Sequence, residues 1–264
     1  MALTLLEKII ALHSGQNQVS PGQIVDISID ARVARDFGGA NVIKNLSEHQ
    51  LNVDDPGKTF FTFDCNPTGS DQSYAVNQQK CRMFAREHGI KVFDINAGIG
   101  THILIEEGLA WPGSTAVSTD SHANVLGAIG SFGQGMGDMD IAAAWNTGKS
   151  WFRVPTSVLL NLTGEFRKEI TAKDIVLNLL KIFGANSLLG YSVEVTGNAA
   201  EKLSLDDRIT ISSMATEMGA IIILFPPSEE VLNYCRKKAG FDFEPVYADQ
   251  NAFYKKVVNI DVSS

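Results

Sequence analysis

Strand-like and helix-like segments alternate along the whole of this 264-residue chain. Residues 21–30, 58–64 and 113–119 carry β-branched or aromatic residues next to turn-forming residues, a pattern that indicates strands. Residues 72–89 lack internal turn signals and end in a glycine, which indicates a helix closed by Gly89. Because strands that alternate with helices build βαβ units, the pattern predicts an α/β fold with largely parallel sheets.

Capping motifs support the expected helices, and the element pattern divides the chain in two. Thr4 and Glu7 form a T-x-x-E capping box ahead of an apolar helix, and Thr171 begins a similar motif. A second series of strands and helices starts near residue 156. We therefore expect two α/β/α-type domains, one over residues 1–155 and the other over residues 156–264.

The composition is that of a globular protein and excludes several classes of partner. The net charge is −8 and there is no run of basic residues, so nucleic acid is not an expected partner. No apolar run approaches the roughly 20 residues that cross a bilayer, so no membrane is expected either. The first ten residues carry charge early and lack the layout of a signal peptide, which favours a cytoplasmic protein.

The chain has three widely spaced cysteines, Cys65, Cys81 and Cys235. An odd number of distant cysteines argues against a disulfide framework, and no pair has the short spacing of a zinc or iron–sulfur motif. No metal site is therefore expected within this chain. Cys81 and Cys235 lie in predicted helices, so we expect both to fill the hydrophobic core.

The segment 118–140, STDSHANVLGAIGSFGQGMGDMD, joins a polar cluster to a glycine-rich run. It follows a predicted strand and is expected to begin a helix, which would place Asp120, Ser121 and His122 at the carboxyl edge of a sheet, where α/β proteins bind ligands. Asp120 or His122 could move protons, and Ser121 could hydrogen-bond an anion. In the alternative, structural interpretation, Ser121 is a helix N-cap and the glycines allow close packing. The glycines fit neither the P-loop nor the dinucleotide-binding spacing.

Three further positions carry polar side chains in comparable surroundings. Asp64 and Cys65 follow a predicted strand and form either an acid beside a thiol or a turn with a buried cysteine. His102 lies in a glycine-bearing loop, where a single histidine is more often structural than catalytic. Glu217 lies on an apolar predicted helix, so it needs a partner if buried, and a histidine would serve.

The run TDSHANVLGAIGSFGQGMGDMDIAAAWNTGKSWFRVP, residues 119–155, resembles the signature of the aconitase and 3-isopropylmalate dehydratase superfamily along its whole length. The segments TLLEKIIALHSG, PGQIVDISID, ITAKDIVL and ITISSMATEMGA are similar to the segments that flank this signature, in the same order. The resemblance covers essentially the whole chain. It is stronger to heteromeric large subunits than to long single-chain aconitases.

This resemblance implies the first two domains of a hydro-lyase that dehydrates and rehydrates hydroxy-di- and tricarboxylic acids. The family uses a four-iron four-sulfur cluster as Lewis acid on the substrate hydroxyl. The resemblance places the cysteine ligands of that cluster in a third domain beyond residue 264, so it implies no cofactor bound by this chain alone. It also implies three partners, namely the cluster-bearing third domain, a small swivelling-domain subunit that supplies the proton-abstracting serine, and a small carboxylate substrate.

Five residues of this sequence match positions that act in catalysis or substrate binding in the family. Asp120, Ser121 and His122 match its Asp-Ser-His motif, in which the serine grips a substrate carboxylate. Glu217 matches the glutamate that supports this histidine. Asp64 matches the aspartate of a separate Asp-His pair.

Other functional positions depart from the family pattern. Cys65 stands where the family has the histidine of the Asp-His pair, and the usual thiol pKa of about 8.5 makes it a doubtful general acid. Thr101 also replaces a histidine, and the neighbouring His102 replaces a glutamine. Arg35 replaces an amide and would add a carboxylate clamp. Ser213 replaces an asparagine.

Three functional hypotheses follow. The first is the front part of a hydro-lyase of the 3-isopropylmalate or 2-alkylmalate dehydratase large-subunit type, which would place it in leucine biosynthesis. The second is a divergent, catalytically inactive paralogue that binds a carboxylate or a partner protein. The third is an enzyme with cluster-free chemistry through Cys65 and Arg35.

Overall fold

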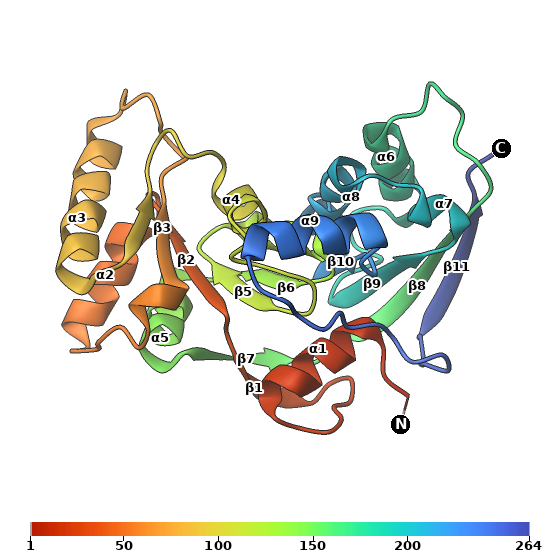
Figure 1. Ribbon diagram of the computed structural model, residues 1–264, viewed down its shortest axis with the longest axis horizontal. Helices are drawn as coiled ribbons and strands as arrows, with labels where there is room; N and C mark the ends of the chain where they lie inside the picture. The colour runs from red at the N-terminus through yellow and green to blue at the C-terminus, as the bar shows by residue number, and fades with distance from the viewer. Residues whose placement is uncertain (1, 264) are drawn as a thin grey trace.

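The computed structural model describes residues 2–263, and within them two parallel sheets are each flanked by helices (Figure 1). The first sheet has five strands in the order β4-β3-β2-β5-β6, and all neighbouring pairs are parallel. Its strands are β2 (Ala31–Arg35), β3 (Thr59–Thr62), β4 (Lys91–Phe93), β5 (Thr115–Ser118) and β6 (Phe132–Gly135). Beside it, β1 (Ile24–Ser28) and β7 (Lys149–Arg153) form an antiparallel pair.

Helices cover both faces of the five-stranded sheet, so β2, β3 and β5 are buried on both sides. Phe61 points into one core layer, with Val42 and Cys81 among its members, whereas the adjacent Phe60 belongs to a second layer that includes Leu104 and Leu126. The helices of this half are α1 (Leu5–Ser14), α2 (Gly39–Glu48), η1 (Pro56–Lys58), α3 (Gln72–His88), α4 (Gly100–Glu106), η2 (Ser121–Ile129) and α5 (Asp138–Thr147). Double burial of the strands is the usual property of parallel sheets.

The second sheet has four parallel strands in the order β10-β9-β8-β11. Its elements are β8 (Thr156–Thr163), α6 (Ala172–Phe183), β9 (Tyr191–Thr196), α7 (Asn198–Glu201), α8 (Leu205–Ser212), η3 (Thr216–Met218), β10 (Ile222–Leu224), α9 (Glu229–Ala239) and β11 (Lys256–Asp261). The predicted α/β class with largely parallel sheets is therefore confirmed. No helix within residues 2–263 is long and apolar enough to span a membrane.

The chain leaves the five-stranded sheet after β6, forms the pair with β1 through β7, and enters the four-stranded sheet at β8, close to the predicted domain boundary. Backbone contacts nevertheless join the halves, because Phe225 N–H donates to the carbonyl of Gly127 at 2.9 Å and Asp249 N–H donates to that of Leu3 at 2.8 Å. The division into domains at residues 1–155 and 156–264 stays a prediction.

The expected helix ends are present. Thr4 accepts a hydrogen bond from Glu7 N–H while the Glu7 carboxylate accepts one from Thr4 N–H, which completes the predicted capping box. Thr171 takes part in the same arrangement at α6. Gly89 ends α3 with φ of 70°, a left-handed conformation that favours glycine.

The glycine-rich run does not continue as the helix that the sequence predicts. The 3₁₀ helix η2 ends at Ile129, and the following residues form strand β6. A Cβ atom added at Gly133 would lie only 2.1 Å from the carbonyl oxygen of Ala123, so the strand lies directly against the backbone of η2. A Cβ atom added at Gly127 would likewise lie only 2.0 Å from the carbonyl oxygen of Ile223. The glycines therefore serve close backbone packing, as the structural interpretation proposed.

Candidate functional site

The candidate site residues lie at the carboxyl ends of three neighbouring strands. Arg35 is the last residue of β2, Asp64 follows β3, and Asp120 follows β5. Because these strands are adjacent in the order β3-β2-β5, their ends converge at one edge of the sheet. This edge is where open parallel sheets bind ligands.

Arg35 forms an ion pair with two carboxylates at once. Its Nε donates to Asp64 Oδ1 at 2.7 Å, and its Nη1 lies 3.3 Å from Asp120 Oδ2. The exposed fractions of the carboxylate side chains are only 6% and 7%, whereas that of Arg35 is 24%. Burial by itself would lower the pKa of Arg35, but the hydrogen bond to Asp64 and the charge of Asp120 raise that pKa above its ordinary value. The guanidinium is therefore a permanent cation that pairs with both carboxylates at this edge.

Each of the two aspartates also binds the start of a helix. Asp64 Oδ2 accepts the backbone N–H of Gly100, the first residue of α4, at 2.8 Å. Asp120 Oδ1 accepts the backbone N–H of His122 at 3.0 Å and is the N-cap of η2. The structural interpretation named Ser121 as the N-cap, but the cap is Asp120. Ser121 is exposed at the first turn.

His122 lies between Ser121 and Glu217. Its Nε2 is 3.0 Å from Glu217 Oε1, and its Nδ1 is 3.2 Å from Ser121 Oγ. Glu217 lies on η3, in the second half of the chain, and Thr216 fixes η3 against η2 by donating from its hydroxyl to the carbonyl of Ser121 at 3.3 Å. A histidine therefore does partner Glu217, although Glu217 is exposed rather than buried. The exposed fractions of the two side chains, 44% for His122 and 39% for Glu217, leave the pair open to solvent.

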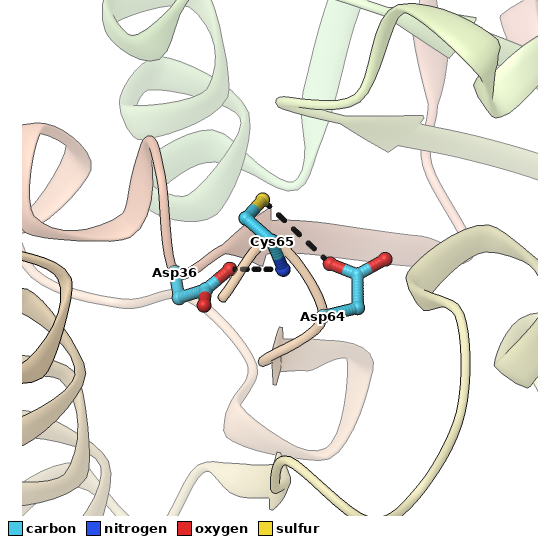
Figure 2. Close-up of side chains that lie close together, drawn as sticks. All are labelled: Asp36, Asp64 and Cys65. Carbon is cyan, nitrogen blue, oxygen red and sulfur yellow. Dashed lines mark hydrogen bonds between the residues drawn. The ribbon is translucent and has the colours of Figure 1, made fainter. Parts of the chain in front are cut away.

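Asp36 is a site residue that the sequence did not indicate, and it lies beside Cys65 and Asp64 (Figure 2). Asp36 is fully buried, accepts Cys65 N–H at 3.1 Å, and accepts the side-chain amide of Gln78 at 2.9 Å. The Cys65 thiol donates to Asp64 Oδ1 at 3.8 Å. Asp36 directly follows Arg35, the last residue of β2. Recognition of that strand, which the sequence pattern did not show, could have indicated Asp36 as a site residue.

Asp36, Asp64 and Cys65 place one ligand atom each within 4.8 Å of one another, a spacing that a metal ion could use. Their chemistry does not favour one. Both carboxylates already accept hydrogen bonds from protein groups, and burial, together with the nearby Asp36, raises the pKa of the Cys65 thiol to about 12. Because these carboxylates already have protein partners, including the Arg35 guanidinium on Asp64, we assign no metal here.

The two remaining positions in α4 behave differently from each other. Thr101 is buried, with an exposed fraction of 2%. His102 has a buried Nδ1 atom with no hydrogen-bond partner within residues 2–263. Neither residue has a described hydrogen bond to Arg35, Asp64 or Asp120. The residues that the structure does bring together are Arg35, Asp64, Cys65, Asp120, Ser121, His122 and Glu217.

The three cysteines do not meet the requirements of an iron–sulfur cluster. Cys81 and Cys235 are buried in two different core layers, as predicted, and Cys65 lies in a loop. Burial raises the pKa of each thiol to about 12. Cluster ligands are cysteine thiolates that converge on one site, so the described residues provide no place for a cluster.

The sequence of residues 7–264 matches the model of one protein family, the Aconitase family (aconitate hydratase). The chain belongs to the aconitase family. The resemblance of residues 119–155 to the family signature is thereby confirmed for the chain as a whole.

Within the family, the chain is similar to proteins that are named large subunits. The chain is 36% identical to a 3-isopropylmalate dehydratase large subunit of Halothermothrix orenii, over 100% of this chain and 63% of the relative. It is also 36% identical to 3-isopropylmalate dehydratase large subunit 1 of Methanopyrus kandleri, with the same coverage. A probable methanogen homoaconitase large subunit of Methanothermobacter thermautotrophicus is 34% identical, over 99% of this chain and 62% of the relative. The chain thus spans less than two thirds of the length of these relatives.

Proposed function

We propose that this aconitase-family chain forms the substrate-carboxylate-binding part of a hydro-lyase that acts on a hydroxy-di- or tricarboxylate. The observation that carries the proposal is the continuous series of contacts from Asp64 through Arg35 and Asp120 to His122 and Glu217. The names of the similar large subunits support a 2-alkylmalate as the substrate class.

Ser121 and His122 are the residues proposed to contact the substrate. Ser121 Oγ is exposed at the first turn of η2, so its hydroxyl is accessible to a ligand at this edge of the sheet. When His122 is protonated, its Nδ1–H donates to Ser121 Oγ, and the serine hydroxyl can then donate to a substrate carboxylate. Glu217 holds Nε2 of the same imidazole and thereby fixes the direction of this hydrogen bond.

Arg35 is better suited to position the site than to hold substrate alone. Two of its nitrogens are already committed to Asp64 and Asp120. A substrate carboxylate would have to use the remaining nitrogen or displace an aspartate. We therefore propose that Arg35 holds the two aspartates in place, and that any contact of Arg35 with substrate is secondary.

The rest of the reaction needs groups from elsewhere. The cluster chemistry of the family has no ligands among the described residues of this chain, and no residue matches the family's proton-abstracting serine. The relatives are named large subunits. We propose a cluster-bearing segment and a small subunit as the partners that would complete the site.

Substitution of Ser121 by alanine tests the carboxylate site directly. Titration of the chain with a 2-alkylmalate in a calorimeter should give a saturable heat, and Ser121→Ala should weaken binding by about 10-fold, the value of one charge-assisted hydrogen bond. Ser70→Ala, at an exposed serine far along the chain, is the matched control and should bind as the unmodified chain does. Equal affinities for Ser121→Ala and the unmodified chain would refute the role of Ser121.

The second candidate function is a catalytically inactive paralogue that keeps the binding site. The observation in its favour is the state of position 65, because a thiol with a pKa of about 12 cannot replace a histidine as general acid near neutral pH. Anaerobic co-expression with a cluster-bearing partner and a small subunit separates the two functions. Dehydration of a 2-alkylmalate by the resulting complex would exclude the inactive paralogue, and a complex that binds the acid without converting it would exclude the hydro-lyase.

A further inference from the structure

A second cavity lies in the half of the chain that carries β8 to β11, and the proposed function does not use it. It has a volume of ≈490 Å³ and lies at the carboxyl ends of β9 and β10. Thr196 and Gly197 contribute from the end of β9, Phe225 and Pro227 from the segment after β10, and Arg208 from α8. Figure 1 shows α8 and α9 beside the ends of these strands. This edge is the usual ligand-binding position of a parallel sheet.

Arg208 is the feature that distinguishes this cavity. Its exposed fraction is 2%, yet no carboxylate within residues 2–263 lies within ion-pair distance of it. Its Nε donates to the carbonyl of Leu203 at 3.1 Å, and its Nη1 donates to that of Pro226 at 2.9 Å. The guanidinium lies 5.4 Å from the ring centroid of Phe225. Two backbone carbonyls and an aromatic ring therefore replace the anion that a buried arginine normally has.

A buried arginine without a counter-ion is costly, because transfer of a charge out of water has to be offset by a partner. Burial lowers the pKa of Arg208, while the more distant charges of Glu230 and Glu201 raise it only in part. An arginine carries five N–H donors, and the described hydrogen bonds engage its Nε and Nη1 atoms. The guanidinium thus retains both charge and donors for a ligand in the cavity that it lines.

We propose that this cavity binds a small molecule with an oxyanion group, a carboxylate or a phosphate, on Arg208. The planar guanidinium suits an oxyanion because two parallel N–H groups can donate to two oxygens. Ser228, the N-cap of the 11-residue helix α9, also lines the cavity. The partial positive charge of that helix end is offset by Glu229 and Glu230 in its first turn, so Arg208 is the main positive group for the ligand. Ala200 and Phe225 form an apolar wall for the body of the ligand.

Substitution of Glu201 distinguishes a simple anion from a zwitterion as the ligand of this cavity. It is exposed and lines the same cavity, but it is not within ion-pair distance of Arg208. A ligand with only negative charge is repelled weakly by Glu201, whereas a zwitterion with an ammonium group would be attracted. Replacement of Glu201 by glutamine should therefore tighten binding of a simple oxyanion, and the proposal commits to that sign.

The experiment is a titration of the full ¹⁵N-labelled chain with inorganic phosphate and, separately, with isobutyrate, followed by NMR. At least one of the two probes should give saturable shifts at residues 195–201, 225–228 and the Arg208 Nε–H. Arg208→Lys keeps the charge but loses the planar donors and should weaken binding by about 10-fold. Glu201→Gln should tighten it by about 2- to 3-fold. Arg167→Lys, at an exposed arginine outside the cavity, is the matched control and should leave the affinity unchanged.

The outcomes separate this proposal from the carboxylate site. Stronger binding of phosphate than of isobutyrate identifies a phosphate ligand, and the opposite order identifies a carboxylate. Shifts confined to Arg35, Ser121 and His122, or no saturable shift with either probe, would overturn the proposal. Because Arg208→Lys removes a buried contact and risks unfolding, Glu201→Gln provides an independent result, and weaker binding by that variant would overturn the simple-oxyanion assignment. Ser121→Ala should leave the cavity shifts intact even if the proposed function is wrong.

Discussion

Replacement of Arg35 by methionine tests the electrostatic logic of the site. Methionine keeps most of the length of the side chain but removes the cation. Asp64 is then almost fully buried without an ion partner, and the equally buried Asp120 keeps only His122 Nδ1, at 3.7 Å. Removal of one partner from a buried ion pair costs roughly 3–5 kcal/mol. Arg35 has an exposed fraction of 24%, so solvent already screens part of its charge, and we expect a loss of about 2–3 kcal/mol in the free energy of unfolding at neutral pH.

Thermal and urea unfolding followed by circular dichroism measure this loss. A destabilisation of 1 kcal/mol lowers the midpoint temperature by roughly 2–4 °C in a chain of this size, so Arg35→Met should lower it by about 4–12 °C. Lys44→Met is a suitable control because Lys44 forms an exposed ion pair with Glu48 at 3.7 Å. Exposed pairs contribute about 0–1 kcal/mol, so the midpoint of the control should change little.

A double-mutant comparison attributes the loss to charge. In a chain with Asp64→Asn and Asp120→Asn the carboxylates are already neutral, so Arg35→Met should cost at least about 1 kcal/mol less than it does in the unmodified chain. An equal cost in both backgrounds would refute the reasoning. It would mean that the methylene groups of Arg35 stabilise the fold by packing and that its charge contributes nothing measurable.

Two further predictions concern other charged groups. Burial raises the pKa of Glu194, although the Tyr254 O–H, which donates to its carboxylate at 2.8 Å, opposes this shift. The stability that Glu194 contributes is therefore fully present below its ordinary pKa of 4.5. It is lost as the pH rises through the higher pKa of the folded state. Glu194→Gln, which stays neutral, should therefore raise the midpoint temperature at pH 8 more than at pH 4.5, and an exposed control, Glu169→Gln, should show no such difference. Arg35→Gln combined with Cys65→His restores the family pattern and should be more stable than Arg35→Gln alone in urea unfolding, whereas equal stability would show that position 65 cannot supply the partner of Asp64.

The sequence predicted the elements with strong local signals, including the four-residue strands β3 and β5, and missed several elements without such signals. Helices α1, α3 and α6 were found because capping residues and terminal glycines mark their ends. Strand β2 and helices α2 and α4 were not found, since segments of 5 to 10 residues without clear caps carry little local information. Strand β6 was mistaken for helix because apolar and small residues in this run recur at helical spacing. Its strand conformation depends on contact with the backbone of η2.

The same distinction holds for the site. Asp120, Ser121 and His122 are adjacent in the sequence, so their clustering needed no knowledge of the fold. The two ion pairs of Arg35 could not be predicted, because they depend on β2 lying between β3 and β5 in the sheet. The position of Glu217 against His122 depends in turn on the docking of η3 against η2.

The departures at positions 35 and 65 have one electrostatic explanation. Where the resemblance to the family sets a histidine beside Asp64, this chain has Cys65, and a cysteine side chain carries no positive charge in either protonation state. Where the family has a neutral amide, this chain has Arg35, which donates to the same aspartate at 2.7 Å. The partner of Asp64 has therefore moved from one strand end to the next, and the aspartate stays paired. A histidine can exchange a proton near neutral pH, whereas an arginine cannot. The exchange thus keeps a cation beside Asp64 while it removes a proton donor. The proposed inactive paralogue, which would bind a carboxylate without the family's acid chemistry at this position, predicts this pattern.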